Sequence, residues 1–106
     1  KFVFNYGAPV LIVLASKPSY ANNFADVSCA MQNMMLACNE LDLGSCWVNQ
    51  IRHLQDNERI QAKMRELGLG EDEKVYASLA IGYPDLPNGL NRRKIEPKGY
   101  KVTYVD

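Results

Sequence analysis

The 106-residue sequence has no excess of either charge, because 12 lysines and arginines balance 12 aspartates and glutamates. A protein that grips nucleic acid or an anionic membrane through its overall charge needs a basic excess, so we expect neither partner here. The longest apolar run, residues 8–15, is far shorter than the roughly 20 residues that cross a bilayer. We therefore expect no membrane segment, and the opening residues do not resemble a secretory leader.

Cysteine and histidine are scarce. Cys29, Cys38 and Cys46 are an odd number of cysteines, and His53 is the only histidine. The cysteine spacings match neither a disulfide framework nor a zinc site, so we expect free thiols, no metal and a reducing cytoplasm. A reactive pair of Cys46 and His53 is disfavoured, because no third group is placed to orient the imidazole. Cys29 and Cys38 are expected to act as small hydrophobes on the apolar face of a helix.

Glycine-rich phosphate loops, internal repeats and low-complexity tracts are also absent, which leaves no nucleotide fingerprint of the common kinds. The content of 47% hydrophobic and 23% charged residues is that of one globular domain. A chain of this length buries about two-thirds of its surface on folding, so it can form a core without disulfides. Because it opens on Lys1 and its first methionine is Met31, we expect a piece of a longer protein.

Hydrophobic patterning predicts strands and helices in one chain. Residues 9–15 are a continuous, mostly branched apolar run that favours a central strand covered on both faces. Asn22 or Asn23 begins a helix that runs to about Leu41, and its wide apolar stripe predicts burial on more than one side. Residues 45–48 form a short extended piece that leads into a turn.

A second helix and a second long strand are predicted further on. Asp56 is expected to cap the helix, and Gly68 ends it. Residues 74–83 are the clearest strand, with uncharged residues on both faces. One face holds Val75, Ala77, Leu79 and Ile81, and the other holds Tyr76, Ser78 and Ala80. Residues 100–105 alternate like an edge strand.

Two segments have side chains suited to binding. The strongest local charge is formed by Arg92, Arg93 and Lys94, which suits a phosphate, although composition alone favours a solvated basic loop. Residues 44–47, Gly-Ser-Cys-Trp, suit a ligand wall, because glycine permits close approach and tryptophan offers a flat face. The alternative is a helix stop followed by a core tryptophan.

Read in order, five segments resemble the C-terminal half of the nitroreductase family of flavin mononucleotide (FMN) enzymes, particularly its smaller members. The segments are Tyr6–Pro9, Ala25–Cys38, Leu43–Gln50, Ala80–Pro84 and the pair Arg93 and Lys94. The resemblance implies an α+β fold with a mixed β-sheet wrapped by helices, incomplete because the N-terminal half is absent. Residues 1–106 would be the C-terminal portion of a single domain, with residues 85–106 as an extended arm that crosses to a partner subunit.

The resemblance also implies a homodimer with FMN at the subunit interface. NAD(P)H would reduce the flavin, and a nitroaromatic, quinone or similar electron-poor small molecule would then be reduced in a ping-pong reaction. The protein would supply binding and orientation and no catalytic side chain of its own.

The flavin contacts follow from the same resemblance. The turn Trp47, Val48, Asn49 and Gln50 matches the segment beside the flavin ring, with an amide near N5, and Cys46 and Trp47 would be wall residues. Arg93, with Arg92 or Lys94 beside it, matches the basic tail that holds the phosphate. The early Arg-x-Ser-x-Arg motif of the family does not occur, and family members often have glycine where Asn49 or Gln50 stands. The alternative is therefore a non-catalytic fragment or assembly module that lacks half of the flavin site.

Overall fold

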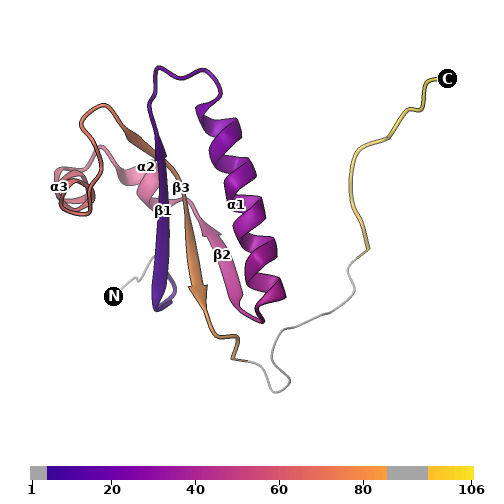
Figure 1. The fold of residues 1–106 in the computed structure, drawn as a ribbon, viewed down its shortest axis with the longest axis horizontal. Coiled ribbons are helices and arrows are strands. Elements are labelled where there is room, and N and C mark those ends of the chain that lie inside the picture. The colour runs from indigo at the N-terminus through magenta and orange to yellow at the C-terminus, as the bar shows by residue number, and fades with distance from the viewer. Residues whose placement is uncertain (1–4, 86–95) are drawn as a thin grey trace.

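The computed structural model describes residues 5–85 and 96–106 and has an α+β fold, as predicted. The elements in chain order are β1 (Val10–Ser16), α1 (Asn23–Glu40), β2 (Gly44–Val48), α2 (Gln50–Leu54), α3 (Glu58–Glu66) and β3 (Lys74–Gly82). The described strands form one sheet in the order β1-β3-β2, and both pairings are antiparallel (Figure 1). The last of the described strands in chain order is thus the central one of this sheet.

β1 is an edge strand of this sheet, so its prediction as a central strand was wrong for the described residues. Its apolar side chains are only partly covered: Val10 is 47% and Ile12 is 37% exposed. The continuous apolar run predicted two covered faces, but it carried no information on how many neighbouring strands β1 would have.

β3 is the buried centre of the sheet, as its uncharged faces predicted. Val75, Ala77, Ser78 and Leu79 have no exposed surface. The predicted alternation is broken at one point, because Leu14 pairs with Ala77 and Ala15 with Val75. Tyr76 is therefore an extra residue without a partner on β1, and a bulge of this kind changes which face the following side chains occupy.

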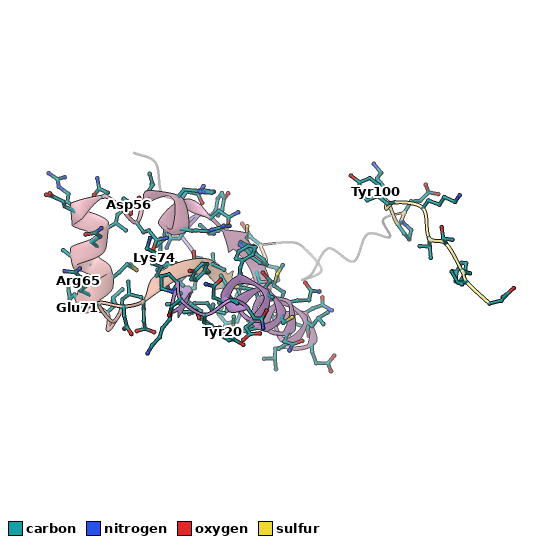
Figure 2. All side chains as sticks on the ribbon, turned by 90° about the horizontal axis from the view of Figure 1, so that it is seen from above. Tyr20, Asp56, Arg65, Glu71, Lys74 and Tyr100 are labelled. Carbon is teal, nitrogen blue, oxygen red and sulfur yellow. The ribbon has the colours of Figure 1, made fainter. Side chains whose placement is uncertain are left out.

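The prediction that Val75 shares a face with Ala77 and Leu79 was wrong, because the bulge lies between them. Ala77 and Leu79 belong to a buried cluster with Val27, Met31 and Cys38 of α1, and Tyr76 packs against this cluster. Val75 belongs instead to a second cluster with Ile51 of α2 and Met64 of α3. The sheet therefore has two covered faces, with α1 on one side and α2 and α3 on the other (Figure 2).

α1 buries one side and leaves apolar residues on its outer surface. Met31 is fully buried, and Val27 and Cys38 are nearly so. Cys29 is exposed, so its prediction as a residue of the buried face was wrong. Leu36 is 58% exposed, so the predicted burial of this helix on more than one side does not occur among the described residues of the single chain.

α2 and α3 differ from the prediction at their starts. The side-chain oxygen of Asn57 accepts hydrogen bonds from the amides of Arg59 and Ile60, so Asn57, not Asp56, caps α3. α2 follows directly on β2 and was not predicted, because five residues are too few to show a helical period. α3 ends as predicted, with Gly68 at a φ of 107°.

Residues 96–106 form neither a helix nor a strand and lie apart from the sheet (Figure 1). Tyr100 marks this segment in Figure 2. Tyr100, Val102, Tyr104 and Val105 are all largely exposed. The strand expected over residues 100–105 does not form within this single chain. Its pairing with a partner subunit stays a prediction.

Candidate functional site

The five predicted flavin-ring contacts lie together where β2 ends and α2 begins. Cys46, Trp47 and Val48 are the last residues of β2, Asn49 is the residue between the two elements, and Gln50 opens α2. Val48 is buried, Trp47 and Gln50 are half-buried, and Cys46 and Asn49 are exposed. These five residues form a short uncharged strip in which Val48 is the one fully buried residue.

Of the two roles that the sequence left open for Trp47, the structure shows the core packing, and the role as a ligand wall stays a prediction. Its ring packs against the buried cluster between α1 and the sheet. Its indole Nε1 donates a hydrogen bond to Oδ1 of Asn49 at a distance of 2.9 Å. The tryptophan is therefore partly a core residue and partly an anchor that holds the side chain of Asn49 in one orientation.

Ser78 is a buried contact of this strip that the sequence analysis missed. Its hydroxyl donates to the carbonyl oxygen of Val48 at 2.8 Å, from the opposing position on β3. A serine in an apolar strand gave only the weak signal of a hydroxyl that must find a partner. The carbonyl oxygen of Val48 is therefore hydrogen-bonded to a side chain of the central strand.

Arg52, one turn after Asn49, was also missed. Its guanidinium lies 4.4 Å from the centre of the Phe24 ring at the start of α1, in a cation–π contact. Phe24 in turn lies 6.3 Å from the ring of Tyr76. These contacts link α2 to α1 and α1 to β3.

A hollow of about 410 Å³ lies at the other end of β2. Its walls come from the segment before β1, from the start of β2 and from the end of β3, and include Tyr6, Pro9, Gly44, Cys46 and Tyr83. Cys46 is the only one of the five clustered site residues that lines it. The hollow is therefore a separate feature from the strip at Trp47 to Gln50.

The remaining predicted contacts, Arg92, Arg93 and Lys94, lie outside the described residues. Within residues 5–85 and 96–106, no three histidine, cysteine or acidic side chains gather as a metal site would require. No helix in that same part of the chain combines the length and apolar character needed to cross a bilayer.

Comparison with known proteins places this architecture. A sequence model of the Nitroreductase family matches residues 3–83. An FMN-bound nitroreductase from Bacteroides fragilis superposes with a TM-score of 0.87 at 31% sequence identity, over 100% of this chain and 56% of its own. One from Desulfitobacterium hafniense, also with bound FMN, has a TM-score of 0.79 at 23% identity, over 97% of this chain and 54% of its own.

A further similar structure is a mutant of an FMN and NADPH-dependent nitroreductase from Sphigopyxis sp. strain HMH. It has a TM-score of 0.65 at 31% identity and is covered over 42% of its length, against 90% of this chain. The chain therefore spans about half the length of the solved structures that it matches. The family match extends from the segment before β1 to the residue after β3, so the chain belongs to the nitroreductase family.

Proposed function

We propose that the parent protein of this chain is an FMN-dependent oxidoreductase. The observation that carries the proposal is the match to an FMN-bound nitroreductase over the full length of this chain, which includes the β2–α2 strip. When bound, FMN supplies the redox chemistry: it takes a hydride equivalent from NAD(P)H and passes two electrons to an electron-poor acceptor such as a nitroaromatic or a quinone.

The donor set at the strip fits an isoalloxazine ring. Such a ring has a flat apolar face and an edge of nitrogen and oxygen atoms, and it needs a flat wall and neutral hydrogen-bond donors. Trp47 supplies an aromatic wall whose position is fixed by packing, and the exposed Asn49 and half-buried Gln50 supply amide groups. The strip is uncharged, so a neutral oxidised flavin would not have to be bound beside a charged side chain. Its residues are Cys46, Trp47, Val48, Asn49 and Gln50.

Binding by the full-length protein is the primary test. After incubation with FMN and gel filtration, the protein is expected to be yellow, with flavin absorbance near about 450 nm. NAD(P)H added without oxygen should bleach that absorbance, and a quinone should restore it. A full-length protein that retains no FMN would overturn the proposal.

The phosphate contact is assigned to Arg93, with Arg92 or Lys94 beside it. A charge-assisted contact of this kind contributes roughly 1.5–3 kcal/mol, so Arg93→Ala should raise the Kd of FMN about ten- to a hundredfold. Riboflavin, which lacks the phosphate, should bind nearly as before. Equal losses for both ligands would show that Arg93 supports the fold instead.

We also propose that the parent is a homodimer whose arm, residues 85–106, crosses to the partner. The outer surface of α1 exposes Cys29, Leu36 and Leu41, and the arm exposes the side chains of Tyr100 and Tyr104. Apolar surfaces of this extent favour burial against another subunit.

A second candidate is a non-catalytic assembly module. It is favoured by the coverage of only about half of each related structure and by the absence of the Arg-x-Ser-x-Arg motif from this chain. FMN titration of the 106-residue chain beside the full-length protein distinguishes the two. Binding by the full-length protein alone would assign the chain to one half of a composite site.

A further inference from the structure

We propose that Ser78 is a positioning residue for the flavin. Resting on the proposed function, in which the family resemblance puts an amide of this turn near the flavin, this inference assigns to the serine the orientation and polarisation of the Val48–Asn49 peptide. Ser78 lies on the central strand, has no exposed surface, and donates to the Val48 carbonyl oxygen at 2.8 Å.

The direction of the Asn49 N–H follows from that bond. In a trans peptide the carbonyl and the N–H point to opposite sides, and the described residues contain no cis bond. With the Val48 carbonyl held toward Ser78 on β3, the N–H of Asn49 points away from β3. β2 is an edge of the described sheet, so this N–H is directed outward from the sheet.

The same bond also changes the strength of the donor. A hydrogen bond accepted by a carbonyl polarises its peptide, and the N–H of that peptide becomes a stronger donor, by about 10–30% per bond. Burial of Ser78 and Val48 excludes water, which would otherwise compete for the carbonyl. The side chain of Asn49 is held as well, by the indole of Trp47, so the peptide has restraints on both of its ends.

The chemical consequence is a fixed dipole at the flavin. Reduction adds negative charge to the ring, and a preorganised N–H with its positive end toward the ring favours the reduced form. Ser78 therefore raises the reduction potential of bound FMN without touching the cofactor itself. A serine that merely satisfied its own buried hydroxyl would affect the stability of the fold and leave the potential unchanged.

The test is the reduction potential of FMN bound to the full-length protein carrying Ser78→Ala. A donor that is about 10–30% weaker toward the reduced ring should lower the equilibrium constant for reduction by about 1.3- to fivefold, a shift of about 3 to 20 mV to more negative potential. The Kd of reduced FMN should rise by the same factor more than that of oxidised FMN. Ser45→Ala is the matched control, because Ser45 also belongs to the sheet and makes no side-chain hydrogen bond within the described residues.

The outcomes separate this inference from the proposed function. A wild-type protein that binds no FMN would remove both. A wild-type protein that binds FMN, with an unchanged or more positive potential in Ser78→Ala, would overturn the role of Ser78 alone. Should Ser78→Ala fail to fold, Ser78→Cys keeps a side chain of the same shape, slightly larger, with a weaker donor. A smaller shift in the same direction is then expected.

Discussion

The side-chain nitrogen of Asn23 donates a hydrogen bond to the hydroxyl of Tyr76 at 3.0 Å. The bond joins the first residue of α1 to the bulged residue of β3, which are 53 positions apart in the chain. Asn23 also donates to the carbonyl oxygens of Lys17 and Pro18, so one amide group links the helix, the sheet and the loop between β1 and α1.

Tyr76→Phe should weaken this link without changing the packing of the ring. Loss of one partly buried hydrogen bond is expected to lower the free energy of unfolding by about 0.5–1.5 kcal/mol. Urea denaturation of the full-length protein measures it. Tyr20→Phe is the control, since Tyr20 is 47% exposed and its hydroxyl makes no bond in the described part of the chain. Equal effects in the two variants would contradict the assigned role of Tyr76.

The start of α3 offers a direct comparison of neighbouring residues. Asn57→Ala removes the acceptor of the Arg59 and Ile60 amides and should cost about 1 kcal/mol of stability. Asp56→Ala should change stability by less than about 0.5 kcal/mol. Thermal unfolding of the two variants in parallel gives the answer, and a larger loss for Asp56→Ala would move the cap back to Asp56.

Gln55 holds β3 from the side of α2. Its side chain accepts a hydrogen bond from the Val75 amide at 2.9 Å and donates to the Val75 carbonyl at 3.0 Å. Val75 is fully buried, so Gln55→Ala leaves two main-chain groups unpaired and should cost about 1–3 kcal/mol. The exposed Gln61 supplies the control, and an unfolding midpoint for Gln55→Ala that equals that of Gln61→Ala would refute the prediction.

Lys17 and Asp72 form an ion pair at 3.1 Å that lowers the pKa of Asp72 below its ordinary value of 3.8, through a hydrogen bond and then through charge attraction. Because the pKa of Asp72 is lower in the folded state, the pair stabilises the fold at pH values above the ordinary pKa of 3.8. This stabilisation is lost as the pH falls through the pKa of the folded state. Lys17→Met should return the pKa of Asp72 toward 3.8 in an NMR titration.

Both side chains of this pair are largely exposed, so added salt should also reduce the shift. Lys63→Met removes a similar exposed pair with Glu66 and serves as the control. A pKa for Asp72 that does not move in Lys17→Met would assign its lowering to the main chain alone.

The strength of dimerisation tests the proposal that the arm, residues 85–106, pairs with a partner subunit. Removal of the residues after Lys98 deletes Tyr100, Val102, Tyr104 and Val105, which are exposed in the single chain. The truncated parent should dissociate at higher concentration than the intact parent, because the strand that pairs with the partner is lost. Sedimentation of both proteins over a dilution series measures the change. A truncated parent that stays dimeric at nanomolar concentration would exclude the crossing strand.

Long elements were predictable from local pattern. α1 and β3 span 18 and 9 residues, so their periodicity is repeated often enough to identify them. The side of the sheet that Val75 faces was not predictable, because it depends on a bulge created by pairing with β1. The edge position of β1 was missed for a related reason, since strand order is set by contacts far apart in the sequence.

The strip at the β2–α2 junction came from a resemblance, and its side chains gave little independent signal. The hydrogen bond from Trp47 to Asn49 was not foreseen. Ser78 lies 30 residues from Val48, and only the antiparallel register of β2 and β3 brings the two together. Contacts of this kind follow from tertiary structure and not from motifs.

The exposed edge of β1 has a practical consequence. Its seven residues, Val-Leu-Ile-Val-Leu-Ala-Ser, contain no charge, no proline and no glycine, and the outer edge pairs with no strand among the described residues. Natural proteins protect such edges with charges, prolines or covering segments, because an open apolar edge is a template for another chain. Expressed by itself, the 106-residue chain should therefore aggregate through β1, and co-expression with the polypeptide that covers this edge should keep it in solution.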